Sequence, residues 1–251
     1  MKFLKQKPTR TPSEDHVQGL DENFFDGPAP SDLSDLTDIE KLFWQADGPV
    51  VHKWHHYLPL YERYFGPFRG KPVRMLEIGV FKGGSLDMWR RWFGPELILF
   101  GIDIDPDCAK FDGMSGQVRI GSQDDPKFLR NVVDEMGGID LVLDDGSHQS
   151  AHIRRSFDVL FPLLNDGGIY MVEDVHADYW SSYGGGYAHS GSFMTQVKQV
   201  LDDMHHWYHR HGQKVAAAKD HVGAVHIHDS IVVLEKNPIP PPRHSMRGAS
   251  E

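Results

Sequence analysis

Cysteine is almost absent from this chain, since Cys108 is the only one in 251 residues. A single cysteine excludes an internal disulfide and any zinc or iron–sulfur site that needs several cysteines, and it fits a reducing compartment. No run approaches the roughly 18 consecutive apolar residues that a membrane span requires. The basic residues near the N-terminus have no apolar stretch behind them. We therefore expect no secretory signal and a cytoplasmic location.

Positive charge is also scarce. The 26 lysines and arginines face 36 aspartates and glutamates, which gives a formal net charge of −10. This excess of negative charge argues against a general affinity for phosphate backbones or anionic lipid. We expect neither nucleic acid nor a membrane as a partner, and the sequence leaves assembly into a homo-oligomer open.

The length suits one α/β domain with a tail at each end. Residues 1–31 are polar and contain several prolines, and a proline-rich run begins residues 237–251. Both segments have the composition of chain without stable structure. The predicted domain therefore covers residues 32–236.

Short apolar runs alternate with amphipathic stretches from Val73 onward, which is typical of βαβ units and a parallel sheet. The predicted strands are Val73–Ile78, Leu97–Ile102, Val118–Ile120, Leu141–Leu143 and Ile169–Val172. Two further β-rich runs, Ala224–His228 and Ile231–Glu235, are only two residues apart, which permits only antiparallel pairing. The predicted fold is α/β and Rossmann-like, mostly parallel, with a C-terminal antiparallel hairpin and helices on both faces.

Helices are predicted from capping residues and apolar stripes. Two of them precede the sheet, over Ser31–Phe43 and His52–Phe65, and Pro59 is expected to interrupt the second. The others cover Ser85–Phe93, the stretch before the fifth strand as far as Leu164, and Ser192–Tyr208.

A glycine-rich loop follows the first strand. Glu77-Ile78 leads into Gly79-Val80-Phe81-Lys82-Gly83-Gly84-Ser85, where a ligand can approach the backbone and the N-terminus of a helix. The spacing differs from the G-x-G-x-x-G of dinucleotide-binding folds. Asp103 ends the second strand, where it can accept hydrogen bonds from ribose hydroxyls, and Ser122-Gln123-Asp124 is the adenine-side candidate. Together with the hairpin, these features favour S-adenosylmethionine over NAD. The alternative is a tight turn that Asp103 caps.

Acidic residues gather at two strand ends. Asp144 and Asp145 end the fourth strand, and Glu173 and Asp174 end the fifth. Because the carboxyl ends of neighbouring parallel strands open onto one crevice, these four carboxylates are expected to converge. Carboxylates that lie so near one another either take up protons or recruit a cation. Mg²⁺ is a cation that prefers oxygen ligands. The alternative is a solvated acidic rim with salt-bridge partners.

His148 follows Asp145 by three residues, near the start of a helix that Ser147 is expected to cap. The positive end of that helix and a nearby dication would both lower its proton affinity, so a neutral imidazole there can act as a general base. The alternatives are that His148 and His152 merely lie on one face of the helix or that they bind a metal ion as a pair.

Gly184-Gly185-Gly186 is either a substrate lid or a flexible connection. The later histidines, from 205 to 228, are expected at the surface or at an interface.

These residues together resemble the macrocin and mycinamicin sugar O-methyltransferases, over roughly residues 35 to 236. The likeness rests on Lys53-Trp54-His55-His56-Tyr57, Tyr61-Glu62-Arg63, Leu76 to Val80 with Gly83 to Leu86, Met88-Trp89, Gly101 to Ile104, Asp144-Asp145-Gly146-Ser147-His148 and Glu173-Asp174. The resemblance implies a class I methyltransferase sheet. It also implies that Asp145, Glu173 and Asp174 hold Mg²⁺ and that His148 is the base.

The implied activity is methyl transfer from S-adenosylmethionine to a hydroxyl of a sugar on a small molecule, as in antibiotic biosynthesis. The catalytic residues would be His148 and Asp145. The cofactor would contact Glu77, Gly79, Gly83, Gly84, Ser85, Asp103, Ser122, Gln123, Asp124 and Asp144. The rivals are a catechol-type O-methyltransferase, for which Trp180, Tyr183 and Tyr187 would clamp an aromatic diol, an NAD-linked oxidoreductase, and a binding module without turnover.

Overall fold

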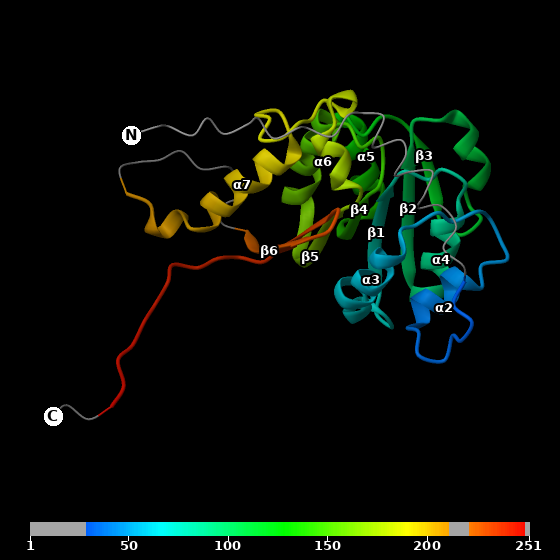
Figure 1. Ribbon diagram of the computed structural model, residues 1–251, viewed down its shortest axis with the longest axis horizontal. Coiled ribbons are helices and arrows are strands. Elements are labelled where there is room, and N and C mark those ends of the chain that lie inside the picture. Colours follow the sequence, from blue (N-terminus) through cyan, green and yellow to red (C-terminus); the bar gives the residue numbers. More distant parts are fainter. Residues whose placement is uncertain (1–28, 211–220, 249–251) are drawn as a thin grey trace, which may run out of the picture. The chain divides into compact units, whose positions relative to one another are not determined.

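A computed structural model describes residues 29–210 and 221–248 (Figure 1). The chain divides into two units, residues 1–36 and residues 37–251. Residues 29–36 of the first unit contain no helix or strand, and the rest of the predicted N-terminal tail lies outside the described residues. Residues 237–248 likewise contain no helix or strand. The division into a domain and two tails stays a prediction.

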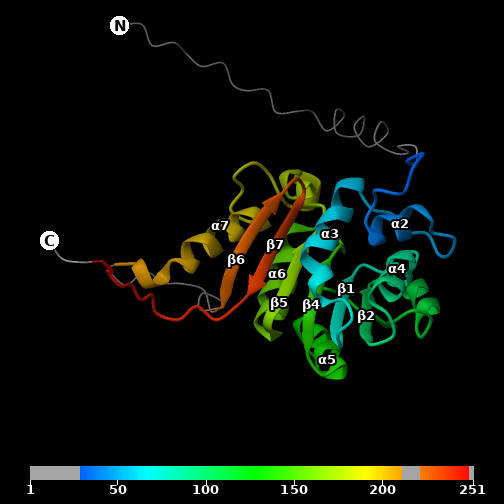
Figure 2. The same cartoon turned by 90° about the horizontal axis from the view of Figure 1, so that it is seen from below.

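The second unit is built on one seven-stranded sheet in the order β3-β2-β1-β4-β5-β7-β6. The strands are β1 (Val73–Ile78), β2 (Leu97–Asp103), β3 (Gln117–Ile120), β4 (Ile139–Asp144), β5 (Leu164–Val172), β6 (Val222–His228) and β7 (Ile231–Lys236). The first five are parallel, and β7 pairs antiparallel with both β5 and β6. The hairpin strands run side by side next to β5 (Figure 2). The predicted fold class is confirmed.

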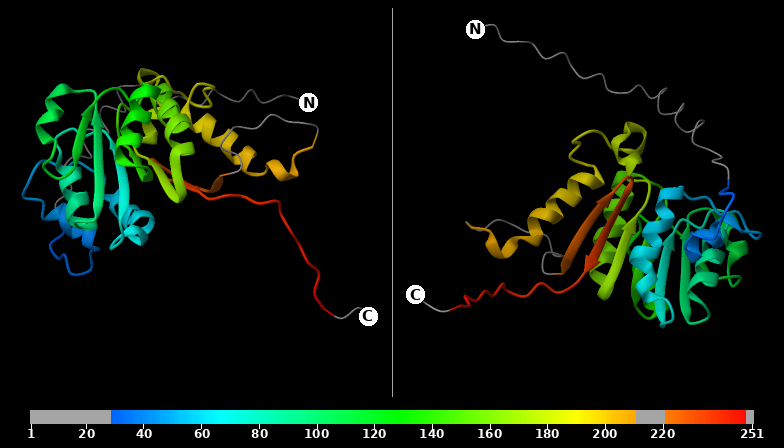
Figure 3. Two further views of the ribbon diagram at one scale, coloured as in Figure 1. Left: turned by 180° about the vertical axis from the view of Figure 1, so that it is seen from behind. Right: turned by 60° about the horizontal axis from the view of Figure 1, so that its bottom comes forward.

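Helices cover both faces of this sheet. They are α2 (Asp38–Trp44), α3 (Leu58–Phe65), α4 (Gly84–Phe93), α5 (Pro126–Met136), α6 (Ser150–Leu160) and α7 (Phe193–Met204). One apolar core joins Leu76 and Ile78 of β1 to α5, α6 and α7, and the other joins Val73 and Met75 to α2, α3 and α4. Side chains that alternate along β1 therefore enter opposite cores. The two helical layers are also visible from behind (Figure 3).

Several predicted helix boundaries were wrong. The helix predicted from His52 begins at Leu58 after a 3₁₀ turn, and Pro59 lies in its first turn, where no intrahelical N–H is needed. α6 ends at Leu160, and Leu164 begins β5. α7 ends at Met204, before Tyr208. No helix within the described ranges is long and apolar enough to cross a membrane.

Candidate active site

A cavity of about 500 Å³ opens at the carboxyl ends of β1, β2, β4 and β5. It lies where the strand order reverses between β1 and β4, the usual ligand position in open α/β sheets. The segment from Val50 to Trp54 forms a further wall, together with Tyr57. Segments far apart in the sequence thus enclose one space.

The loop after β1 packs tightly on the loop after β4. Gly79 has φ +98°, and a Cβ atom there would lie 2.1 Å from the carbonyl oxygen of Asp145. Glycine is therefore required at this position. Gly79 and Ser85 line the cavity, whereas Gly83 and Gly84, which the sequence also predicted as cofactor contacts, do not line it. A Cβ on Gly84 would meet the backbone of Val50 at 2.3 Å.

Asp103 lines the cavity and also holds the glycine loop. Its Oδ2 accepts hydrogen bonds from the N–H groups of Val80 at 2.9 Å and Phe81 at 3.0 Å, and its Oδ1 accepts from Asp105 at 2.9 Å. Burial opposes ionisation, but these backbone donors outweigh it and lower the pKa of Asp103. The carboxylate caps the turn, as the alternative predicted, and still faces the space where a ligand would bind.

Gln123 connects the third and fourth strand ends. Its Nε2 donates to Oδ1 of Asp144 at 3.1 Å, and its Oε1 accepts from the N–H of Ser147 at 2.7 Å. Ser122 and Gln123 line the cavity, but Asp124 does not, and an oxygen of Asp124 lies 3.6 Å from Arg155. Sequence reasoning had grouped all three as cofactor contacts.

Asp144 and Glu77 are buried beside the cavity and do not line it. Asp144 accepts from Ser156 Oγ at 2.6 Å and Tyr170 OH at 3.0 Å, and burial raises its pKa. Glu77 accepts from Ser85 Oγ at 3.0 Å, and burial raises its pKa to about 7. The structure thus gives both carboxylates internal partners where the sequence predicted contacts with a ligand.

Lys53 is a buried cation that sequence reasoning did not assign to the site. Its Nζ lies 2.5 Å from Oδ2 of Asp145 and 2.8 Å from Oε2 of Glu173. The hydroxyl of Tyr61 donates to the other oxygen of Glu173. Burial raises the pKa of Glu173, and the charge of Lys53 opposes this. Both oxygens of Glu173 are therefore engaged inside the protein.

Asp145, His148 and Asp174 offer ligand atoms that all lie within 4.8 Å of one another, and they form the one such group found among the described residues. Nε2 of His148 is 3.7 Å from Oδ2 of Asp174, and the hydroxyl of Tyr57 donates to Oδ1 of Asp174 at 2.7 Å. The expected trio was Asp145, Glu173 and Asp174. The structure brings two of these together with His148, and two carboxylates fit the oxygen preference of Mg²⁺.

His148 lies ahead of α6 with φ +55°, outside the helix. The cap position belongs to Gln149, so the prediction that Ser147 caps this helix was wrong. The hydroxyl of Ser147 instead accepts from the N–H of Gln149 at 3.3 Å and lies 2.9 Å from Nδ1 of His152. His152 therefore pairs with Ser147, and of these two histidines it is His148 that lies beside Asp174.

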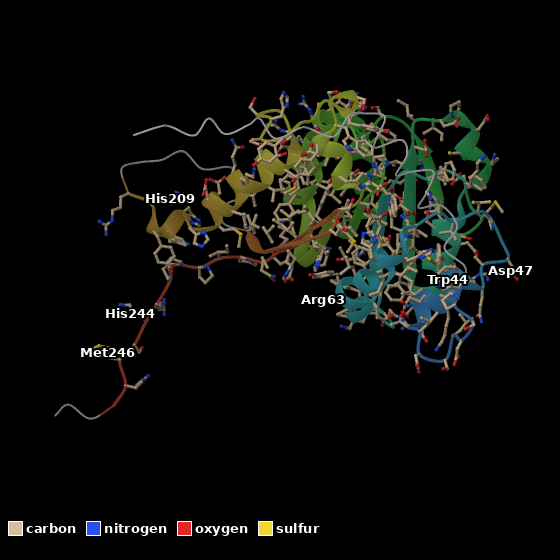
Figure 4. The ribbon with its side chains drawn as sticks, viewed as in Figure 1. Trp44, Asp47, Arg63, His209, His244 and Met246 are labelled. Carbon is tan, nitrogen blue, oxygen red and sulfur yellow. The ribbon has the colours of Figure 1, made fainter. Side chains whose placement is uncertain are left out.

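The later histidines lie apart from this group. His205 and His206 follow α7, and a ring nitrogen of each lies close to a backbone carbonyl, at 2.8 Å from that of Leu201 and 3.1 Å from that of Asp203. Figure 4 shows His209 beyond the C-terminal end of α7, and His211 lies outside the described residues.

The site also uses three residues that were not predicted as site residues, Lys53, Tyr57 and Tyr61. They belong to two of the motifs that carried the family resemblance, Lys53 to Tyr57 and Tyr61 to Arg63.

Comparison with known proteins agrees with this architecture. A family model described as "Methyltransferase domain" matches residues 76–175. The solved structure of the MycE methyltransferase from the mycinamycin biosynthetic pathway, in complex with Mg, SAH and mycinamycin VI, has a TM-score of 0.71 at 30% identity, over 81% of this chain and 54% of that one. Fold, cavity and family model together define a methyltransferase domain.

The curated relatives narrow this class. A rhamnosyl tetracenomycin-C 2'-O-methyltransferase of Streptomyces olivaceus is 36% identical over 79% of this chain and 58% of its own length. Demethylmacrocin O-methyltransferase of Streptomyces fradiae is 35% identical over 74% of this chain and 51% of its own length. The predicted resemblance is confirmed, and the chain groups with the sugar O-methyltransferases. It spans about half the length of the curated relatives it matches.

Proposed function

We propose that this protein is an S-adenosylmethionine-dependent and Mg²⁺-dependent O-methyltransferase that acts on a hydroxyl of a sugar carried by a small molecule. One observation supports this most strongly. Asp145, His148 and Asp174 converge on the cavity of a methyltransferase fold, where a base and a pair of metal-binding carboxylates are needed together.

The cofactor would lie along the loops that follow β1, β2 and β3. Gly79 lets the backbone come close, Asp103 accepts from ribose hydroxyls, and Ser122 and Gln123 lie at the far wall. The charge on Asp103 favours free hydroxyls over a 2′-phosphate. S-adenosylmethionine supplies the methyl group on a sulfonium centre.

Asp145 and Asp174 would hold the dication. Glu173, which the resemblance adds as a third ligand, already accepts hydrogen bonds from Lys53 and Tyr61 and would join the two aspartates through a remaining lone pair. When bound, a dication supplies positive charge that favours the ionised form of a nearby hydroxyl. Tyr57 keeps Asp174 in place by donating to Oδ1 at 2.7 Å.

His148 would take the proton of the reacting hydroxyl on Nε2, which lies 3.7 Å from Oδ2 of Asp174. As the new oxygen–carbon bond forms, the carbon–sulfur bond breaks, and its electron pair stays on sulfur. An unactivated sugar hydroxyl is a poor nucleophile, and a positioned base contributes about 10²- to 10⁴-fold in rate.

The catechol alternative finds less support in this geometry. The predicted flat clamp would hold a diol between parallel aromatic faces, whereas the rings of Trp180 and Tyr183 are inclined by 57° to each other. Tyr187, the third member of the predicted clamp, is 90% exposed. The glycoside is therefore the acceptor that we propose.

The test is a screen of labelled methyl transfer from S-adenosylmethionine to glycosides and to catechols, with Mg²⁺ and with EDTA. We expect label on glycosides only when Mg²⁺ is present. His148→Gln should remove most turnover while S-adenosylhomocysteine still binds, and His205→Gln, beyond α7, is the matched control. Full activity in EDTA, or no binding of S-adenosylhomocysteine, would contradict the proposal.

A further inference from the structure

Five half-buried rings form an arc that meets the cavity at both ends. Neighbouring ring centroids are 6.0 Å apart for Trp54 and His176, 5.0 Å for His176 and Trp180, 5.8 Å for Trp180 and Tyr183, and 6.4 Å for Tyr183 and His148. Trp54 and His148, the two ends of the arc, line the cavity, and the three rings between them stand next to its lining. The arc therefore extends from the cavity wall.

The arc passes around Asp174. That residue lies at the start of the short 3₁₀ helix η5 (Val175–Tyr179), which carries His176, and His148 approaches its carboxylate from the other side. Nδ1 of His176 is 2.5 Å from Oγ of Ser230 in the β6–β7 turn. A molecule with a hydroxyl at His148 and Asp174 would thus have its remaining atoms beside these rings.

The loop that carries Trp180 is folded back on itself. The N–H of Gly185 donates to the carbonyl of Trp180 at 3.1 Å, and the N–H of Gly186 donates to that of Asp178 at 2.9 Å. A Cβ on Gly185 would lie 1.9 Å from the Asp178 carbonyl oxygen. The buried Asp178 carboxylate in turn accepts from the N–H groups of Phe193 and Met194 at the start of α7. These contacts hold the ring of Trp180 in place.

We propose, on the basis of the function proposed above, that this arc binds the sugar ring of the acceptor through one of its C–H faces. Successive rings of the arc are inclined by 86°, 64°, 57° and 55°. Rings at such angles form a curved surface, which a thick, saturated pyranose can touch in several places. Such sites combine apolar rings with a few polar groups, and the imidazole of His148 supplies one for a sugar hydroxyl.

The experiment is saturation-transfer NMR on the full chain with S-adenosylhomocysteine and Mg²⁺, using methyl α-L-rhamnopyranoside and catechol as separate probes. We expect transfer to the ring C–H protons of the sugar and little to catechol. Trp180→Leu and, separately, Tyr183→Leu should each weaken sugar binding by about tenfold, the size expected for losing one aromatic contact of roughly 1.4 kcal/mol. Trp207→Leu, at an exposed tryptophan after α7, is the matched control and should bind the sugar normally.

Calorimetry with S-adenosylhomocysteine on every variant separates this proposal from the proposed function. Unchanged cofactor binding with lost sugar binding supports the arc. Sugar binding that survives both arc substitutions, or no transfer to the sugar in the unaltered chain, overturns the arc proposal alone. Failure of the unaltered chain to bind S-adenosylhomocysteine would instead contradict the proposed function. Two separate arc variants are used, so misfolding of either one leaves the other to decide.

Discussion

Nζ of Lys53 lies 2.8 Å from Oε2 of Glu173, although the two residues are 120 positions apart in the sequence. Their side chains are only 2% and 1% exposed. The same ammonium lies 2.5 Å from Oδ2 of Asp145. One internal cation therefore pairs with the acids at the ends of two strands. Burying charges is costly unless they are paired, and this pairing lets the acids lie together.

Lys53→Met should lower the free energy of unfolding by about 3 to 5 kcal/mol, the range for breaking a buried ion pair from one side. The reason is that Glu173 and Asp145 would keep their burial and lose their shared counter-ion. Urea denaturation at neutral pH measures the change. Lys127→Met, at an exposed lysine on α5, is the control and should shift stability by about 0.5 kcal/mol or less. Equal stability of the two variants would show that the Lys53 pair does not stabilise the fold.

Glu77→Gln should change how stability depends on pH. Burial raises the pKa of Glu77 to about 7 in the folded protein, from 4.5 as the reference value. Between these values the folded state binds more protons than the unfolded state, so the glutamate costs stability as pH rises. As pH rises across this window, the free energy of unfolding of the variant should increase relative to that of the original chain by on the order of 3 kcal/mol.

Denaturation curves at several pH values from 5 to 8 measure that difference. Glu96→Gln, at an exposed glutamate before β2, is the control and should run parallel to the original chain. A Glu77→Gln curve that also runs parallel would mean that Glu77 ionises as freely in the folded protein as in the unfolded chain.

Tyr57→Phe should weaken Mg²⁺ binding by about 10- to 100-fold, as expected for losing a group that orients a metal ligand. The hydroxyl of Tyr57 donates to Oδ1 of Asp174 at 2.7 Å and lies 2.8 Å from Oγ of Ser230. Without it, the carboxylate loses its fixed orientation. Calorimetric titration with Mg²⁺ measures the affinity. Tyr64→Phe removes a hydroxyl that contacts His228 at 2.8 Å, away from the cavity lining, and should leave the affinity unchanged. The idea fails if both variants bind Mg²⁺ alike.

Gly79→Ala should weaken binding of S-adenosylhomocysteine by about tenfold or more. A methyl group there would lie 2.1 Å from the carbonyl oxygen of Asp145, so the two loops must separate. Gly70→Ala is the matched control, because Gly70 also has positive φ, +68°, but has nothing within 4 Å of a Cβ. It should cost about 1 kcal/mol of stability from its backbone alone and leave binding intact. Normal binding by Gly79→Ala would show that the loop contact is dispensable.

The strands and the convergence of acids were accessible from the sequence because both follow from local rules. Alternating apolar runs mark the strands, and the carboxyl ends of parallel strands must meet. Asp145 and Asp174 could therefore be placed together before any coordinates. The start of α6 was missed because serine is a preferred cap residue and glutamine is not, whereas in the fold the hydroxyl of Ser147 contacts His152 and α6 begins after Gln149.

The sequence by itself determined the strands in their order along the chain, the hairpin that ends the sheet, and the acids at each strand end, since these depend on periodicity and on neighbours along the chain. It missed α5 (Pro126–Met136) between the third and fourth strands. Only the tertiary structure decided which charges pair. Asp144 accepts hydrogen bonds from Ser156 and Tyr170, and Glu173 pairs with Lys53. His148 lies close to Asp145 and Asp174. A buried charge pairs with whichever partner the folded backbone brings within reach. The local sequence does not specify which residues lie that near in space.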